Sequence, residues 1–319
     1  MDIYRTDRTM ALVALGGNAL IRLGEKGTIE EQEKNAKEIC GYLMSLVRRD
    51  YNIIMTHGNG PQVGNLLLRN ETSREVLPSM PLDVLVAETE GSMGYMLQQA
   101  LLNHLRNEDI QRYVVTVITQ VLVDRNDPAF AMPSKPIGLY YPKDKADEMM
   151  SRFGWKMIED SGHGWRRIVP SPKPLKIIQR HMIRHSAMEG NIVIAGGGGG
   201  IPVQITPDGH YEGIEAVIDK DLTASNLASE IKADIFIILM PQPRIYVHYG
   251  TAKQKALGRV TLSQIKDYLA EGHFPPGNIG PKVTACINFV ERGGKEAFIT
   301  CAELLEDALE GGEGTHIVP

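Results

Sequence analysis

The chain has 319 residues, of which 43% are hydrophobic, and carries a formal charge of −5 with a pI near 6.0. It is long enough to bury one large core or two moderate ones. Its mild acidity argues against a nucleic-acid-binding surface, which normally shows a basic stripe. No stretch approaches the roughly 20 apolar residues of a membrane helix, and the N-terminal residues lack the apolar segment of a secretory signal. We therefore predict a cytoplasmic protein that binds neither nucleic acid nor membrane.

Short apolar runs rich in β-branched residues alternate with helical patterns along the chain. This alternation predicts an α/β fold whose mostly parallel sheet is covered by helices on both faces. Thr28 and Glu31 have the spacing of a capping box at the start of the first helix. The predicted strands are Ala11–Leu15, Ile53–Thr56, Val114–Thr119, Ile192–Ala195, Ile235–Leu239 and Ala297–Thr300.

Two breaks in the pattern divide the chain. Between about Val123 and Lys173 the sequence is rich in Pro, Gly and charged residues, which predicts a small inserted subdomain over about residues 124–174. A second break at 207–213 places a lobe boundary near Tyr211. We therefore expect one lobe over 1–211, including the subdomain, and another over 212–319. The three cysteines, Cys40, Cys286 and Cys301, lack metal-ligand spacing and are interpreted as reduced packing residues.

Several predicted strands end in glycine. Gly16, Gly17 and Asn18 follow the first strand, and Gly58, Asn59 and Gly60 follow the second, with Pro61 at the first position of a helix. Such glycines let backbone N–H groups approach an anion, although each turn alone could be a simple tight turn. Five further glycines, Gly196–Gly200, follow a third strand, and we favour a ligand-lining turn over a flexible linker.

Three lysines indicate where an anion would bind. Lys282 lies in the first turn of a helix opened by Pro281, where a cation is unfavourable unless an anion is near. Lys220 precedes another helix, which we expect Asp221 to cap. Lys135 lies between two prolines in the inserted subdomain. For Lys282, a solvated surface lysine is the alternative.

The lysines and the glycine-lined turns together predict a binding site for a nucleoside triphosphate. Phosphoryl transfer requires mainly alignment and neutralisation of oxygen charge, with a divalent metal such as Mg²⁺ bridging the phosphates. An ionised acceptor needs no general base, so His57, His163 and His185 are interpreted as structural or orienting. No cluster with the spacing of a protein metal site is present in the sequence.

At these motifs the sequence resembles the carbamate kinases of the amino acid kinase family over nearly its whole length. The matching blocks are VALGGNAL at 13–20, THGNGPQVGNLLL at 56–68, GYMLQQAL at 94–101, DPAF and PSKPIG within 127–138, GWRRIVPSPKP at 164–174, AGGGGGIPV at 195–203, EAVIDKDL at 215–222 and EGHFPPGNIGPKV at 271–283. The resemblance implies a three-layer αβα sandwich of two lobes with a small protruding subdomain, assembled as a homodimer. It also implies reversible transfer between ATP with carbamate and ADP with carbamoyl phosphate, with Mg²⁺, commonly in arginine breakdown.

The resemblance also implies roles for individual residues. The first lobe would hold the acceptor through Gly16, Gly17, Asn18, Gly58 and Asn59. Lys135 would reach in from the subdomain, and Asp221 would hold the lysines in register. The second lobe would hold the nucleotide through Lys220, Met240, Tyr246, Ile279, Gly280 and Lys282.

Three segments depart from the family pattern. Met240-Pro241-Gln242 stands where the family usually has Thr-Asp-Val. Because Pro241 and Pro243 have no N–H, this turn beside the nucleotide cannot offer the same backbone hydrogen bonds. Asn278-Ile279 replaces Ser-Met, and Glu90 stands before Gly91 where Gln is common. We therefore hypothesise altered contact with the nucleotide base. The alternatives are a weakened regulator of the same fold and a kinase for another small acid.

Overall fold

The computed structural model describes residues 7–16, 19–22, 24–160, 162–275 and 279–319. Its centre is an eight-stranded sheet in the order β15-β17-β16-β12-β1-β2-β9-β3. Every neighbouring pair is parallel except β16 and β17. The six predicted strands all lie in this sheet, as β1 (Met10–Leu15), β2 (Asn52–Thr56), β3 (Val114–Val117), β9 (Ile192–Ala195), β12 (Ile235–Leu239) and β16 (Glu296–Thr300), joined by β15 (Arg259–Thr261) and β17 (Thr315–Val318).

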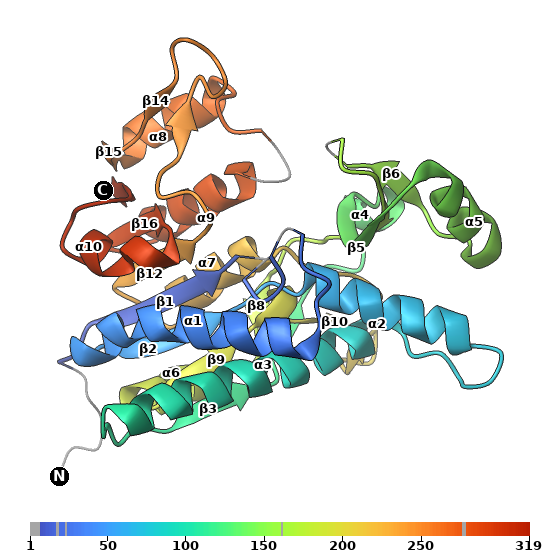
Figure 1. Cartoon of the computed structure of the whole chain (residues 1–319), viewed down its shortest axis with the longest axis horizontal. Coiled ribbons are helices and arrows are strands. Elements are labelled where there is room, and N and C mark those ends of the chain that lie inside the picture. Colours follow the sequence, from blue (N-terminus) through green and yellow to red (C-terminus); the bar gives the residue numbers. More distant parts are fainter. Residues whose placement is uncertain (1–6, 17–18, 23, 161, 276–278) are drawn as a thin grey trace.

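Helices cover both faces of the sheet, so the predicted three-layer αβα fold is confirmed (Figure 1). Strand β1 is buried on both faces, because alternate side chains of a strand point to opposite sides of the sheet. Leu12 and Ala14 enter one core, and Ala11 and Val13 enter the other. The first core lies under α6 (Arg180–Met188), α7 (Lys220–Glu230), α8 (Leu262–Ala270) and α9 (Ile279–Glu291), and the second under α1 (Ile29–Arg48), α3 (Leu82–Asn107) and α10 (Leu305–Leu309).

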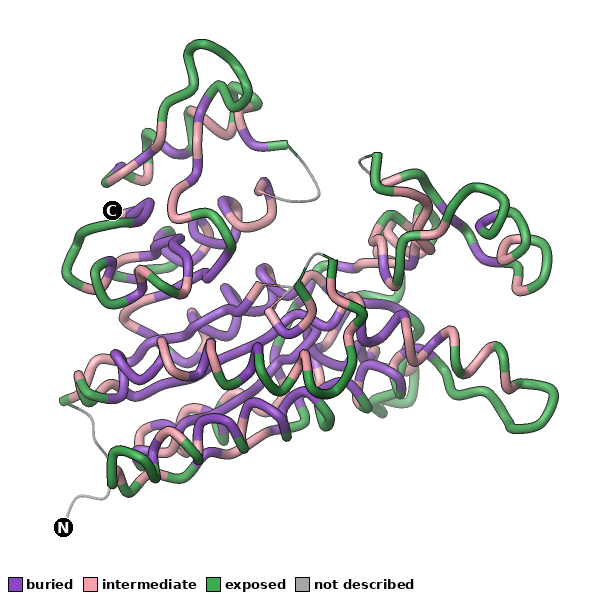
Figure 2. The backbone as a smooth tube through the Cα atoms, viewed as in Figure 1, coloured by how far each residue is buried: buried purple, intermediate pink, exposed green. Residues whose placement is uncertain are grey.

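The start of α1 follows the predicted capping box. The Thr28 hydroxyl accepts the Glu31 N–H, and the Glu31 carboxylate accepts the Thr28 N–H. The buried side of this helix includes Cys40, while Cys286 and Cys301 are also buried and unpaired, as predicted for packing residues. Figure 2 shows the buried backbone concentrated along the sheet and its covering helices. None of the described helices is long and apolar enough to cross a membrane.

The inserted segment forms the predicted protruding subdomain. Its antiparallel sheet has the order β5-β7-β6 and projects away from the central sheet (Figure 1). Its base rests on α2 (Gly60–Ser73), where a Cβ at Gly64 would lie 1.9 Å from the Gly138 Cα. The two backbones therefore touch at a pair of glycines. The subdomain comprises α4 (Pro128–Ala131), β5 (Lys135–Tyr141), α5 (Lys143–Phe153), β6 (Met157–Glu159) and β7 (Trp165–Val169).

Smaller elements complete the fold. A second sheet, in the order β11-β10-β4-β8, carries Tyr211 in its edge strand. The glycine run forms a short 3₁₀ turn, η1 (Gly197–Gly199), between β9 and β10. The remaining elements are β4 (Gln120–Leu122), β8 (Lys176–Ile177), β10 (Ile201–Ile205), β11 (Tyr211–Gly213), β13 (Tyr246–Val247), β14 (Lys255–Ala256) and η2 (Ala302–Leu304).

Candidate functional site

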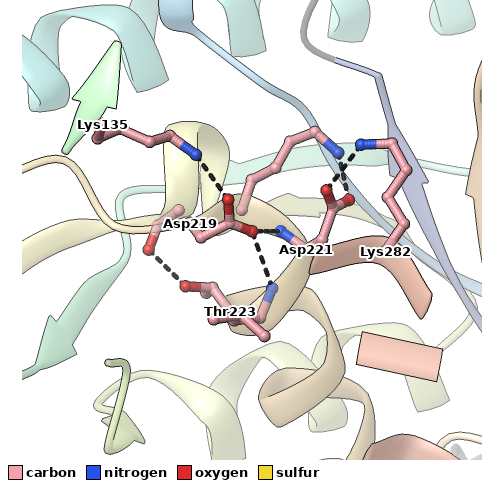
Figure 3. A network of polar contacts seen from close by, with 8 residues as sticks. Lys135, Asp219, Asp221, Thr223 and Lys282 are labelled. Atoms are coloured by element: carbon pink, nitrogen blue, oxygen red, sulfur yellow. Dashed lines mark hydrogen bonds and ion pairs between the residues drawn. The ribbon is translucent and has the colours of Figure 1, made fainter. Parts of the chain in front are cut away.

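The amino end of α7 is capped by Asp219. One carboxylate oxygen of Asp219 accepts the N–H groups of Asp221, at 3.0 Å, and of Leu222, at 3.3 Å. The prediction that Asp221 is the cap is wrong, because the helix begins at Lys220 and Asp221 is already inside its first turn. The side chain of Asp221 is thereby left to make other contacts (Figure 3).

Asp221 binds two of the predicted lysines at once. Lys220 Nζ lies 2.5 Å from one carboxylate oxygen and Lys282 Nζ lies 3.0 Å from the other. Lys282 comes from the first turn of α9, where Pro281 is the third residue rather than the first as predicted. Two helix starts 61 positions apart in sequence thus present their cations to one carboxylate (Figure 3). The predicted convergence of these lysines is what the structure shows.

Burial makes this trio electrostatically strong. The side chains of Asp221, Lys220 and Lys282 are only 4%, 10% and 13% exposed. Burial alone would raise the pKa of Asp221, but the charges of the two lysines hold that pKa far below its usual range. Burial, with help from the neighbouring Lys282, lowers the pKa of Lys220. Burial also opposes the charge on Lys282, but Asp221 outweighs it and raises the pKa of Lys282.

The third lysine reaches the same place from the subdomain. Lys135 Nζ lies 2.6 Å from the second carboxylate oxygen of Asp219, the residue that caps α7. Figure 3 shows Lys135 approaching Asp219 from the side opposite Lys282. This ion pair is more exposed than the trio, at 29% for Lys135 and 17% for Asp219. Sequence reasoning did not assign a role to Asp219, although the Asp-Lys-Asp spacing before a helix could have indicated it.

The glycine run packs against the second strand end. The Gly198 N–H donates to the His57 carbonyl at 2.7 Å, and a Cβ at Gly198 would lie 2.1 Å from the Asn59 amide nitrogen. A Cβ at Gly197 would lie 2.3 Å from His57 Nε2. These glycines therefore allow the close approach that we predicted, here to protein side chains. The neighbouring Thr223 hydroxyl of α7 donates to the Gly199 carbonyl at 2.8 Å, which ties the run to the lysine site.

His57 is buried against this turn and is held neutral. Burial lowers its pKa to about 4, and the charge of Lys220 acts in the same direction. Its Nδ1 lies 3.2 Å from the Gly58 carbonyl. His57 therefore packs the glycine turns, in agreement with its interpretation as an orienting residue.

The other predicted site residues occupy several places. Gly16 directly follows β1, and a Cβ added there would lie 3.2 Å from the Leu239 carbonyl, while Gly17 and Asn18 lie outside the described residues. Met240 is buried after β12, and Tyr246 lies in β13 with its ring centroid 6.0 Å from that of Tyr249. Gly280 in α9 is closed in by the Pro275 carbonyl, and Ile279 begins that helix.

The donors at this site suit Mg²⁺ held mainly by a substrate. Over the part of the chain that the structure describes, no three His, Cys, Asp or Glu side chains form a metal-binding group. Both nearby carboxylates, Asp219 and Asp221, are bound to lysines. A Mg²⁺ ion brought in by a nucleotide would need few protein ligands, and Asp219 and Asp221 are the carboxylates that it could contact here.

Comparison with known proteins agrees with the fold. The sequence profile described as "Amino acid kinase family" matches residues 9–301. A carbamate kinase of Thermococcus kodakarensis is 47% identical over 310 residues, covering 96% of this chain and 98% of the relative. Among solved structures, a Giardia lamblia carbamate kinase bound to citric acid superposes with a TM-score of 0.93, and one bound to AMP-PNP with 0.89. Both are 37% identical to this chain, and each match covers 98% of either chain.

Proposed function

We propose that this chain, which belongs to the amino acid kinase family, is a carbamate kinase. It would transfer a phosphoryl group reversibly between ATP and carbamate, with ADP and carbamoyl phosphate as the other pair. The observation that carries the proposal is the convergence of Lys135, Lys220 and Lys282 on two carboxylates at the start of α7. The near-complete coverage of carbamate kinase relatives supports the choice of acceptor.

The lysines supply what phosphoryl transfer needs. In the direction that forms ATP, an ADP oxygen attacks the phosphorus of carbamoyl phosphate, and the bond to the carbamate oxygen breaks with its electron pair. Carbamate leaves as an anion, so no side chain has to remove a proton. After release it takes up one proton from water and decomposes to ammonia and carbon dioxide. Lys220 and Lys282 would neutralise the phosphate oxygens, with Asp221 fixing both ammonium groups. Bound Mg²⁺ would add charge neutralisation between the phosphates.

The two lobes would divide the substrates. Residues 1–211 would bind the acceptor through Gly16, Gly17, Asn18, Gly58 and Asn59, with Lys135 approaching from the subdomain. Residues 212–319 would bind the nucleotide through Met240, Tyr246, Ile279 and Gly280 beside the two buried lysines. A homodimer acting in the cytoplasm, in arginine breakdown, belongs to the same proposal and is supported by the resemblance.

The turn after β12 would change the contact with the nucleotide base. Pro241 and Pro243 have no N–H to donate, and the N–H of Met240 is already bonded to the Thr300 carbonyl at 2.9 Å. Changing Met240→Thr, Pro241→Asp and Gln242→Val together should tighten the binding of an ATP analogue over a GTP analogue. Calorimetric titration measures both affinities, and identical values in the two proteins would refute this role of the turn.

The function is tested by ATP synthesis. The protein is mixed with carbamoyl phosphate, ADP and Mg²⁺, and ATP is followed by luminescence. We expect robust ATP formation that falls at least about 100-fold in Lys220→Ala, because a charge aligned with the transferring group is lost. Lys295→Ala removes an exposed lysine paired with Asp234 and serves as the control. A folded wild-type protein that forms no ATP would overturn the proposal.

A further inference from the structure

Helix α3 carries two adjacent polar side chains in its buried face. Thr89 is 0% and Glu90 2% exposed, although the helix is otherwise packed by apolar residues in this region. The Thr89 hydroxyl accepts the Asn59 amide N–H at 2.9 Å. Thr89 thus fixes a residue that we place in the acceptor site.

Glu90 is connected to the glycine run through one residue. Its Oε2 accepts the Thr119 N–H at 2.8 Å. The Thr119 hydroxyl in turn accepts the Gly196 N–H at 2.9 Å, and the Thr119 carbonyl accepts the Ile201 N–H at 2.8 Å. Thr119 therefore holds both ends of the glycine run, and Glu90 holds Thr119. The run itself is the surface on which His57 and Asn59 pack.

Among the residues that the structure describes, no charged side chain pairs with the carboxyl group of Glu90. Its Oε1 is buried without a hydrogen-bond partner among the described residues. Burial raises the pKa of Glu90 well above its usual range, and only the Thr119 N–H acts against this. Two titratable groups lie on the elements joined to the glycine run: His57, which is neutral against Gly197, and Lys220, which is engaged by Asp221. No charged side chain of the described residues contributes to the shift.

We propose that Glu90 is a positioning residue that works as a neutral carboxylic acid, holding the glycine run under the acceptor site through Thr119. Ionisation would place an unpaired charge on the buried face of α3, where it costs free energy unless water reaches it. The ionised state favours arrangements in which the contact between Glu90 and Thr119 opens. The glycine run then loses its support, and binding of the acceptor weakens.

This inference rests on the proposed function and predicts a specific pH dependence. If only the protonated form is competent, the apparent KM for carbamoyl phosphate rises up to tenfold for each pH unit above the pKa of Glu90, while kcat stays nearly constant. The proton is released to solvent, and no covalent step is involved. Glu90→Gln has the same shape as the protonated acid and cannot ionise, so its KM should stay flat over the same range.

The experiment compares the full-length protein with Glu90→Gln from pH 6 to pH 10, measuring KM and kcat for carbamoyl phosphate. Glu88→Gln is the matched control, since Glu88 is exposed on the same helix and should behave as wild type. Equal KM profiles for wild type and Glu90→Gln would overturn the proposal. So would a profile that differs only in kcat.

A second measurement needs no activity and separates the two proposals. The midpoint of urea unfolding should fall with rising pH in wild type relative to Glu90→Gln, because the folded state keeps a proton that the unfolded chain has released. Hydrogen exchange of the Gly196 amide, measured in both proteins at each pH, should show protection lost at high pH in wild type alone. If ATP synthesis is absent but these differences appear, the proposed function fails and the support of the glycine run by Glu90 stands. If neither difference appears, the role of Glu90 is refuted.

Discussion

Removing the charge of Asp221 tests the centre of the site most directly. Asp221→Asn keeps the size of the side chain and one oxygen acceptor, but it removes the charge of the one carboxylate that both Lys220 and Lys282 contact. Their side chains are only 10% and 13% exposed. Breaking a buried ion pair by removing one partner costs about 3 to 5 kcal/mol. We expect a loss near the lower end, about 3 kcal/mol at pH 7, since the amide oxygen still accepts one hydrogen bond.

The pH dependence of this loss identifies its cause. Without Asp221 the pKa of Lys220, already lowered by burial, falls further below that of the unfolded chain. The folded variant then binds fewer protons than the unfolded chain, so its stability rises with pH towards about 10, the ordinary pKa of lysine. The destabilisation relative to wild type should therefore shrink from pH 7 to pH 9.5.

Urea unfolding at the two pH values, followed by circular dichroism, measures both effects. Asp147→Asn is the control, because Asp147 is 54% exposed in its pair with Lys143, and we expect a change below about 0.5 kcal/mol. ATP synthesis by Asp221→Asn should fall at least about 100-fold. A variant as stable as wild type at pH 7 would show that the two lysines do not depend on this carboxylate.

Three further predictions follow from the contacts of the site. Lys135→Ala should raise the KM for carbamoyl phosphate at least about tenfold. Lys145 is an exposed lysine of the same subdomain, so Lys145→Ala should leave steady-state kinetics unchanged. If Lys135→Ala has the same kinetics as wild type, Lys135 lies outside the acceptor site. Gly198→Ala should destabilise by about 1 to 3 kcal/mol more than Gly154→Ala in urea unfolding, because both glycines have φ +67° but only Gly198 faces a side chain within 4 Å; equal losses would refute the packing argument. His57 has a pKa of about 4 in the folded chain, against about 6.5 in the unfolded chain. The stability that its neutral form provides is therefore complete above pH 6.5, and up to about 1.4 kcal/mol is lost per pH unit as the pH falls towards 4. An imidazole NMR signal that titrates near 6.5 would contradict this.

The central sheet was predicted well because a buried parallel strand can be recognised from its own residues. Strands β9 and β12 have the predicted bounds, Ile192–Ala195 and Ile235–Leu239. A short continuous apolar run rich in β-branched residues between turn residues is typical of a buried strand. The strand from Val114 was predicted two residues too long, because Thr119 is β-branched but binds Glu90 and Gly196 by its own polar groups. Hydrophobic pattern alone does not contain that contact.

The site was predicted in part for a related reason. Lys220 and Lys282 were found from their positions at helix starts, where local rules apply, and Lys135 from the prolines on both sides of it. Which carboxylate Lys220 and Lys282 share depends on where α7 begins, and a shift of two residues exchanges the roles of Asp219 and Asp221. The link from α3 to the glycine run joins Glu90 to Thr119, which is 29 positions away. Tertiary hydrogen bonds of this kind follow no hydrophobic periodicity, so the sequence pattern does not predict them.

The two aspartates at the start of α7 divide the lysines into a fixed pair and an exchangeable one. Lys220 and Lys282 share a carboxylate that is 4% exposed, so separating either from it would leave a buried charge unpaired. Lys135 is bound to Asp219, whose other oxygen still caps α7 when the lysine leaves. This pair is partly solvated and contributes little stability. A phosphoryl group entering the site would therefore take Lys135 from Asp219 at small cost, while the lysines from α7 and α9 stay where Asp221 holds them.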